Sequence, residues 1–209
     1  MKRIRIFFLL FLAPLAFSQN SFHPKPIAPK EFAVMAWGDS PSDADQLRGM
    51  KEAGLNISGF CRAEDLARVK AAGLTCFVND PKLSAYAPDQ LPPTATIRRD
   101  ITDLKKRIGE NPAALGIFLR DEPPATLMPG LGKLAGLLRE EMPDKWPYVN
   151  LFPYRVSPAV LGTADYDSYV RMLVKTIGQP FLSYDNYSLV NGEMLDPFYT
   201  NLEIIRRLG

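Results

Sequence analysis

Polar side chains that could do chemistry follow the short apolar runs of this sequence at nearly every repeat. They are carboxylates, amides and guanidinium groups, each placed where an apolar run ends: Asp39, Arg62, Asn79, Asp80, Arg120, Asp121, Glu122, Asn150, Asp185 and Asn186. Aromatic residues accompany them, namely Trp37, Phe60, Tyr154, Tyr184 and Tyr187. Carboxylates carry acid/base chemistry, while amides and guanidinium groups hold hydroxyls and aromatic faces stack on sugar rings. No ligand spacing of a metal site is present, so we expect neither a metal nor a cofactor.

Glu122 is the sharpest single candidate for a catalytic side chain. It ends the apolar run 116–119 and is followed by two prolines, which restrict the backbone as the chain leaves the run. Apolar neighbours at such a position raise the pKa of a carboxyl group and suit it to act as a general acid. The alternative is structural, with Glu122 held in a salt bridge to Arg120 or Arg62.

The elements that must position these residues alternate between apolar runs and amphipathic stretches. The apolar runs predict strands at 33–37, 55–61, 74–78, 114–120, 147–151 and 181–185. The amphipathic stretches predict helices at 43–53, 63–72, 94–109, 128–142, 166–177 and 196–208. Between the third strand and the third helix lies a proline-rich loop, 80–93.

Continuous apolar strands between helices indicate a parallel α/β sheet that is buried on both faces. Six β-α units of roughly 30 residues each are present, and polar residues collect at the strand ends, as in a TIM-type (β/α)8 barrel. Eight units need roughly 250 residues, so the barrel is expected to be incomplete. The rival is a doubly wound open sheet, but the first strand lacks the dinucleotide glycine fingerprint of that fold.

The first residues read as a targeting segment. Lys2, Arg3 and Arg5 precede the apolar run 6–15, and the small residues of 16–18 follow it, as in a secretory signal peptide. The run is shorter than the roughly 20 apolar residues that span a bilayer. We therefore predict a periplasmic or extracellular protein, without a membrane anchor after cleavage. The predicted division is a signal peptide at 1–18, a linker at 19–31 and a partial barrel domain at 32–209.

Charge and composition exclude several classes of function. The formal net charge of +2 does not indicate a nucleic-acid partner. The single histidine, His23, lies in the linker, which argues against Ser-His-Asp chemistry and histidine-rich zinc sites. Cys61 and Cys76 both fall in predicted buried strands. Their pairing in an oxidising compartment is open, but we favour free buried thiols that fill the core.

The stretch from Gly116 to Pro123 resembles the fourth strand of retaining (β/α)8 glycoside hydrolases of the β-galactosidase and cellulase type. The stretches 148–151 and 182–187 look like strands five and six of secreted, glycosidase-like bacterial proteins. The resemblance implies that Glu122 is the general acid/base. Asp121 replaces an asparagine that normally precedes this glutamate and binds the sugar's 2-hydroxyl. The resemblance places the nucleophile, a glutamate, after a seventh strand that this sequence does not contain.

The resemblance thus implies a glycoside hydrolase-like protein for an extracytoplasmic oligo- or polysaccharide, inactive if truncated. The expected substrate-binding residues are Trp37, Asp80, Arg120, Asp121, Asn150, Tyr184, Asp185 and Tyr187. Asp185 is also a possible replacement for the second catalytic carboxylate, the nucleophile. The alternatives are a non-catalytic carbohydrate-binding barrel and an exported barrel enzyme of other chemistry, such as a lyase or a metal-dependent hydrolase. Because parallel strands at an open barrel edge lack partners, self-association through that edge is expected as well.

Overall fold

The computed structural model describes residues 32–194 and 197–208, so the predicted signal peptide and the predicted linker lie outside the described residues. Its central element is a four-stranded parallel sheet with the order β1-β2-β3-β4. The strands are β1 (Ile57–Cys61), β2 (Thr75–Val78), β3 (Ala114–Asp121) and β4 (Trp146–Asn150). The parallel sheet and its sequential strand order confirm the predicted α/β class.

Each of the six predicted helical stretches contains a helix. The helices are α1 (Ala44–Glu52), α2 (Leu66–Ala71), α4 (Thr94–Ile108), α5 (Met128–Glu141), α7 (Tyr166–Ile177) and α8 (Pro197–Leu208). Asp43 caps α1, because its side chain accepts hydrogen bonds from the backbone N–H groups of Asp45 and Gln46.

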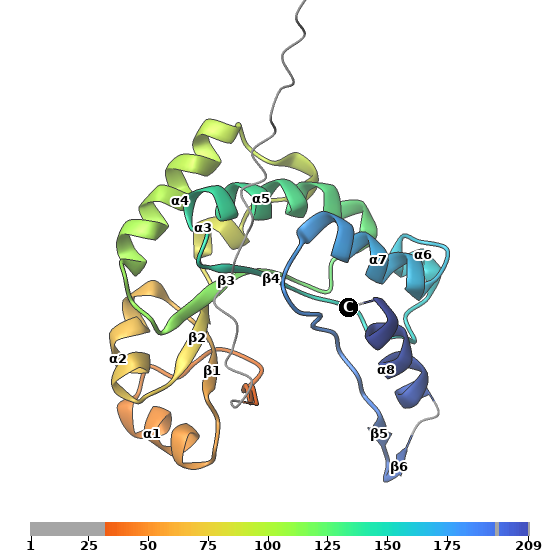
Figure 1. The fold of residues 1–209 in the computed structure, drawn as a ribbon, viewed down its shortest axis with the longest axis horizontal. Helices are drawn as coiled ribbons and strands as arrows, with labels where there is room; N and C mark the ends of the chain where they lie inside the picture. Colours follow the sequence, from red (N-terminus) through yellow and green to blue (C-terminus); the bar gives the residue numbers. More distant parts are fainter. Residues whose placement is uncertain (1–31, 195–196, 209) are drawn as a thin grey trace, which may run out of the picture.

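Shorter elements lie before and between these helices and strands. They are η1 (Ala63–Asp65), α3 (Pro81–Ser84), η2 (Pro88–Gln90), η3 (Ala125–Leu127), α6 (Pro158–Leu161), β5 (Leu189–Val190) and β6 (Glu193–Met194). The predicted loop 80–93 thus contains two short helices. The strands β5 and β6 form an antiparallel hairpin that projects away from the main sheet (Figure 1).

The two faces of the sheet are covered differently. One face packs against the helices in the main core, to which strand residues such as Ile117 and Val149 contribute. The other face carries an aromatic cluster of Phe60, Phe77, Trp146 and Tyr148, and the described helices add no side chain to it. Figure 1 shows the helices as an arch over the first face. Helices on one face and strand side chains on the other fit a barrel wall and argue against a doubly wound sheet.

The predicted first and sixth strands are present beside the sheet as isolated bridges rather than strands. Residues 35 and 39 bridge to β1, and Tyr184 bridges to Leu151, just beyond β4. Side-chain amides take over part of the ladder at both edges. Asn56 bonds the backbone of Val34 and Phe32, and Gln179 bonds both backbone groups of Val149. The strand prediction is therefore wrong at 33–37 and 181–185, although the position of each stretch beside the sheet is right.

Cys61 and Cys76 are joined in a disulfide, so the preference for free thiols is wrong. They lie on the neighbouring strands β1 and β2, with Cα atoms 6.2 Å apart, and both side chains face the helix-side core. This separation is within the normal range for a disulfide. Two buried cysteines were expected, but the register of adjacent strands decided that they meet.

Among the described residues, none of the helices has the length and apolar character needed to traverse a bilayer.

Candidate functional site

The carboxyl ends of β3, β4 and the 181–185 stretch meet at one edge of the sheet. Asp121 is paired across the ladder with Asn150, and Glu122 follows at once. The backbone N–H of Asp185 donates to the carbonyl of Leu151, which brings Asp185 beside the end of β4. The structure thus brings together four predicted site residues: Asp121, Glu122, Asn150 and Asp185. We call them the carboxylate cluster.

Asn150 is the buried centre of the carboxylate cluster, with 1 % of its surface exposed. Its Nδ2 donates to Asp121 Oδ1 at 3.0 Å and to Asp185 Oδ1 at 2.9 Å. Its Oδ1 accepts from Ser183 Oγ at 2.7 Å, and that hydroxyl lies 2.9 Å from Tyr148 Oη. Ser183 therefore fixes which way the amide points, and both amide protons stabilise negative charge on the two aspartates.

Ser183 is a site residue that sequence reasoning missed. Its signal is its position two residues before Asp185, since alternate residues of an extended stretch share a face. The same alternation turns Tyr184 the other way, into the helix-side core. Tyr184 is partly buried there, and its expected role in substrate binding stays a prediction.

Glu122 has an unusual backbone for a glutamate. Its φ is +42°, in the left-handed region that residues other than glycine and asparagine rarely adopt. It is held there by its own N–H, which donates to the Asn150 carbonyl at 2.9 Å, and by Pro123, whose carbonyl accepts from Tyr169 Oη at 2.8 Å. Such backbone strain costs about 1–3 kcal/mol and clusters at functional sites.

The surroundings of Glu122 favour its protonated form. Burial raises the pKa of this carboxyl group to about 7, and a side-chain hydrogen bond with Asp185 and the negative charges of Asp185 and Asp121 add to the rise. Of the ion pairs that the described residues form, none includes Glu122. The alternative of a rim salt bridge with Arg120 or Arg62 is therefore wrong.

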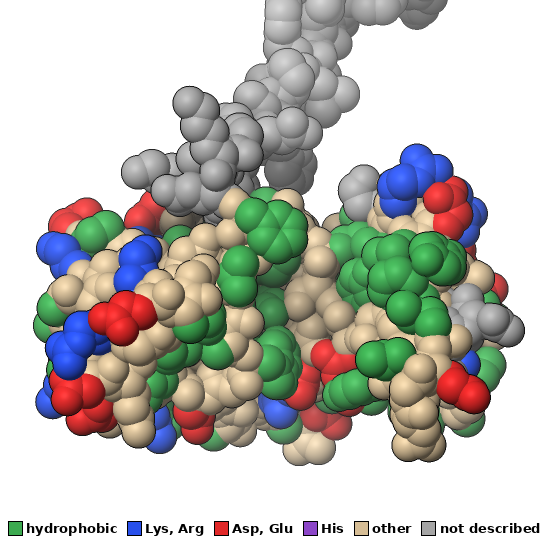
Figure 2. Space-filling model, turned by 90° about the horizontal axis from the view of Figure 1, so that it is seen from below, with side chains coloured by type: hydrophobic (Ala, Val, Ile, Leu, Met, Phe, Trp, Pro, Cys, Tyr) green, Lys and Arg blue, Asp and Glu red, His purple; other side chains and the backbone are tan. Residues whose placement is uncertain are grey.

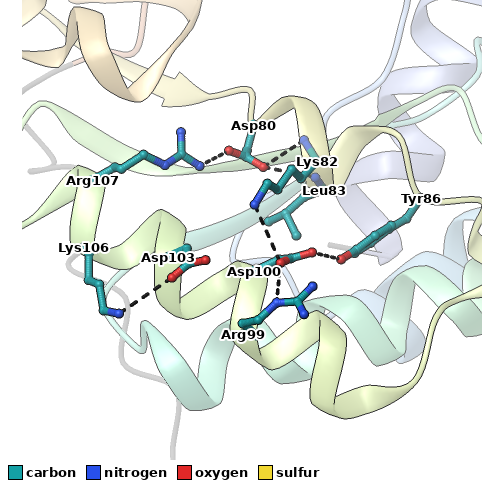
Figure 3. A network of polar contacts seen from close by, with 9 residues as sticks. All are labelled: Asp80, Lys82, Leu83, Tyr86, Arg99, Asp100, Asp103, Lys106 and Arg107. Carbon is teal, nitrogen blue, oxygen red and sulfur yellow. Dashed lines mark hydrogen bonds and ion pairs between the residues drawn. The ribbon is translucent and has the colours of Figure 1, made fainter.

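Two other predicted site residues lie elsewhere in the structure. Asp80 is buried, caps α3 through the N–H groups of Lys82 and Leu83, and pairs with Arg107 (Figure 3). Arg120 donates from Nη2 to the carbonyl of Tyr86 at 2.7 Å. Asp80 and the Nη2 group of Arg120 thus hold the segment after β2 in place, whereas Arg120 Nε is buried without a hydrogen-bond partner among the described residues. Neither joins the carboxylate cluster, and their role in substrate binding stays a prediction.

The two remaining predicted site residues, Trp37 and Tyr187, are aromatic and exposed. Trp37 is 52 % exposed and packs edge-on against Phe60, with ring centroids 5.1 Å apart. Tyr187 is exposed, and its hydroxyl donates to Asp185 Oδ2 at 3.2 Å. In Figure 2, hydrophobic side chains lie within a hollow on this side of the molecule, and acidic side chains gather near one end of it. The carboxylate cluster thus has aromatic side chains beside it.

A pocket of about 130 Å³ adjoins the carboxylate cluster through Tyr187. The loops after β4 and after the 181–185 stretch form it together with α8. Its lining residues are Pro153, Tyr154, Arg155, Asn186, Tyr187, Ser188 and Phe198. Three aromatic rings make this an apolar-walled pocket, suited to the C–H face of a ring-shaped ligand. Within 32–194 and 197–208, no group of three or more His, Cys, Asp or Glu residues is arranged to hold a metal ion.

No protein-family model matches the chain, and no curated protein matches it in sequence. Solved structures do match it in fold. A β-glucuronidase of Bacteroides uniformis aligns with 83 % of the chain at a TM-score of 0.50 and 17 % identity. An FMN-binding β-glucuronidase of Facaelibacterium prausnitzii aligns with 86 % at a TM-score of 0.55 and 12 % identity. The 3-dehydroquinate dehydratase of Aquifex aeolicus aligns with 85 % at 0.50 and 14 %.

The chain spans 23 % and 29 % of the length of the two glucuronidases, and 75 % of the dehydratase. At such identities the similarity establishes the fold alone. The names of these three proteins describe two different reactions. The fold shared with these proteins, together with the one-sided sheet, is that of an incomplete TIM-type barrel.

Proposed function

We propose that this protein is a glycoside hydrolase-like protein that acts on an oligo- or polysaccharide outside the cytoplasm, with Glu122 as its general acid/base. One observation carries the proposal: a carboxyl group whose pKa lies at about 7 stands at the carboxyl end of a barrel strand, beside two further carboxylates. A general acid must be protonated at the working pH, and a pKa near 7 allows that. The glucuronidases that share the fold support the same reaction class.

In the proposed reaction, Glu122 gives its proton to the glycosidic oxygen while the bond from that oxygen to the anomeric carbon breaks. The leaving sugar departs as an alcohol. Glu122, now ionised, takes a proton from water as the water oxygen attacks the anomeric carbon. The negative charges of Asp121 and Asp185 oppose loss of the proton in the free enzyme and stabilise the positive charge of the oxocarbenium-like transition state.

We assign Asp185 a role in holding the proton on Glu122 rather than the role of nucleophile. The negative charge of Asp185 contributes to the raised pKa of Glu122, so it opposes loss of the Glu122 proton. Asn150 Nδ2 donates to Asp185 Oδ1 at 2.9 Å and holds that carboxylate in place.

The aromatic groups beside the carboxylate cluster suit a carbohydrate. Tyr154, Tyr187 and Phe198 line the adjoining pocket, and Trp37 exposes half of its surface near the aromatic side of the sheet. Aromatic faces bury the C–H groups of a pyranose ring, while the cluster supplies acceptors for its hydroxyls. This combination of an aromatic wall and polar groups supports a sugar as the substrate.

Export is part of the proposal. The Lys-Arg start and apolar run of 1–18 support it, and so does the Cys61–Cys76 disulfide, because disulfides persist in oxidising compartments. Expression of the chain with its own first residues, followed by cell fractionation and mass spectrometry of the exported product, tests this. A product that stays in the cytoplasm with residue 1 intact would exclude export.

The reaction is tested with a panel of aryl α- and β-glycosides. We expect Glu122→Gln to lower kcat/KM by at least 10²-fold, because general-acid catalysis contributes about 10²–10⁴-fold. The matched control is Glu52→Gln on the exposed end of α1, which should leave turnover unchanged. In the wild type, kcat/KM should fall as the pH rises through about 7, since Glu122 then loses its proton. Full turnover by Glu122→Gln would overturn the assignment.

The second candidate is a non-catalytic carbohydrate-binding barrel. Asp121 favours it, because this residue stands where the glycosidases that the sequence resembles have an asparagine. Oligosaccharide binding without turnover of any glycoside in the panel would select it. Self-association through an open edge of the barrel stays a prediction, which sedimentation equilibrium would test.

A further inference from the structure

Two tyrosines of α7 donate hydrogen bonds to the two loops that carry the candidate site. Tyr166 and Tyr169 are three residues apart, so they share one face of the helix. Both are buried, with 4 % and 0 % of their surfaces exposed. Neither belongs to the carboxylate cluster, and neither lines the pocket beside it. We call them the α7 tyrosine pair.

Tyr169 contacts the turn that contains Glu122. Its Oη donates to the carbonyl of Pro123, the next residue, at 2.8 Å. The same oxygen accepts from the backbone N–H of Phe152, in the loop after β4, at 3.4 Å. Burial and the nearby negative charges of Glu122 and Asp121 raise the pKa of Tyr169. The hydroxyl therefore keeps its proton and remains a donor to this turn.

Tyr166 contacts the loop after β4, which forms one wall of the aromatic pocket. Its Oη donates to the carbonyl of Phe152 at 2.9 Å. Its ring packs edge-on against Tyr154, with ring centroids 5.5 Å apart. Tyr154 and the neighbouring Pro153 both line the pocket. Tyr166 thus holds the pocket wall, whereas the hydroxyl of Tyr169 also reaches the turn after β3.

The turn after β3 needs such support because Glu122 has a φ of +42°. A glutamate stays in this region only where its surroundings hold it. Its N–H donates to the Asn150 carbonyl, which holds one side of the turn, and the bond from Tyr169 to the Pro123 carbonyl holds the other. Because Tyr169 is fully buried, water cannot replace this donor without a change in packing.

The groups that face Glu122 show what a relaxed turn would change. They are the carboxylates of Asp121 and Asp185 and the hydroxyls of Tyr169 and Tyr187. Both aspartates raise the pKa of Glu122, in addition to the effect of burial. A turn that moves away from them, toward water, would therefore lower the pKa of Glu122.

We propose that the α7 tyrosine pair fixes the position of Glu122 relative to the aromatic pocket, with Tyr169 as a positioning residue for Glu122 and Tyr166 as a positioning residue for the pocket wall. This inference rests on the proposed function for the role of Glu122. One helix thus holds both the group that would give the proton and the wall that would bind the substrate.

The first test measures the pKa of Glu122 without any substrate, by carbon-13 NMR titration of its carboxyl carbon. Tyr169→Phe keeps the ring in the core and removes only the donor to the turn. We expect it to lower the pKa of Glu122 by about 1 pH unit, because the turn relaxes away from the aspartates. Tyr166→Phe is the matched control. It removes the same group from the same helix and should leave the pKa of Glu122 unchanged.

The second test separates kcat from KM on the aryl glycosides. Tyr169→Phe should lower kcat about tenfold with KM nearly unchanged, because a small displacement of a catalytic group slows the reaction. The pH at which its kcat/KM falls should move down together with the pKa from NMR. Tyr166→Phe should instead raise KM about threefold or more with kcat nearly unchanged. Tyr199→Phe on the exposed face of α8 should alter neither constant.

Three results would overturn the proposal. An unchanged pKa of Glu122 in Tyr169→Phe, or equal shifts in the two α7 variants, would show that the hydroxyl of Tyr169 does not position Glu122. A Tyr169→Phe protein that does not fold, beside a folded Tyr166→Phe, would assign this hydroxyl to the fold alone. The proposed reaction fails separately: full turnover by Glu122→Gln refutes it, while the NMR titration still decides whether Tyr169 positions Glu122.

Discussion

Two acidic regions of this molecule follow neighbouring strands, yet their electrostatics are opposite. After β2, Asp80 pairs with Arg107, and Asp100 of α4 accepts from Tyr86 Oη at 2.6 Å (Figure 3). That hydrogen bond and the nearby Arg99 hold the pKa of Asp100 below its usual value. After β3, Glu122 has carboxylates rather than arginines around it, and its pKa rises to about 7. The first region stabilises the fold through its ion pairs. The second region brings three carboxyl groups together without a cation, which favours the protonated form of Glu122.

The largest expected effect comes from breaking the region after β2. Asp80→Ala should lower the free energy of unfolding by about 2–3 kcal/mol, because it removes a helix cap and leaves the partly buried Arg107 without its main partner. The matched control is Asp103→Ala in the same network, whose exposed pair with Lys106 should contribute less than about 0.5 kcal/mol. Urea unfolding measures both variants. Equal losses would show that Asp80 is as dispensable as a surface aspartate.

A medium effect is expected on the pH dependence of the free energy of unfolding, because Glu122 has a raised pKa. The folded protein keeps the Glu122 proton up to a pH of about 7, whereas the unfolded chain releases it near 4.5. The folded state therefore binds more protons between these values, and stability should fall as the pH rises through this window. We expect a loss of about 1–2 kcal/mol after allowance for solvent screening.

The measurement is urea unfolding of the wild type and of Glu122→Gln from pH 4 to pH 8. The variant lacks the titrating group, so it should match the wild type at low pH and exceed it at pH 8. Parallel curves for the two proteins across the whole range would contradict the raised pKa.

The smallest expected effect concerns backbone strain. Glu122→Gly should be about 1 kcal/mol more stable than Glu122→Gln at the same pH, because glycine adopts a φ of +42° without strain. The comparison with the glutamine variant removes the charge effect. Asn191→Gly in the β5–β6 hairpin is the control, since asparagine tolerates its φ of +53° and should gain less. Thermal unfolding measures these differences. No gain at residue 122 would show that its backbone is relaxed.

Much of the fold follows from local sequence patterns. The six helical stretches and the four sheet strands were predicted from apolar periodicity, with errors of a few residues at their ends. The two stretches wrongly predicted as strands, 33–37 and 181–185, lie where side-chain amides replace backbone hydrogen-bond partners. The amides of Asn56 and Gln179 interrupt the ladder at the two edges of the sheet, and no periodicity reveals this. The disulfide of Cys61 and Cys76 depended on strand register in the same way.

The site was predicted in part. Position after a strand identified Asp121, Glu122, Asn150 and Asp185, because parallel strands bring their carboxyl ends to one edge. The same rule selected Asp80, whose carboxylate is paired with Arg107, and Arg120, which donates from Nη2 to the Tyr86 carbonyl. Chain position shows that a residue is near the edge, but the partners of its side chain decide whether it is available for a substrate.

The sequence alone determined that the chain alternates strands and helices, that its strands are parallel, and that carboxylates end them. These properties depend on residue type and period, which are local. Only the tertiary structure decided that Arg107 pairs with Asp80, that Asn150 donates to both aspartates, and that Glu122 has no arginine partner. The physical reason is that a pKa depends on charges and burial contributed by segments far apart in the chain.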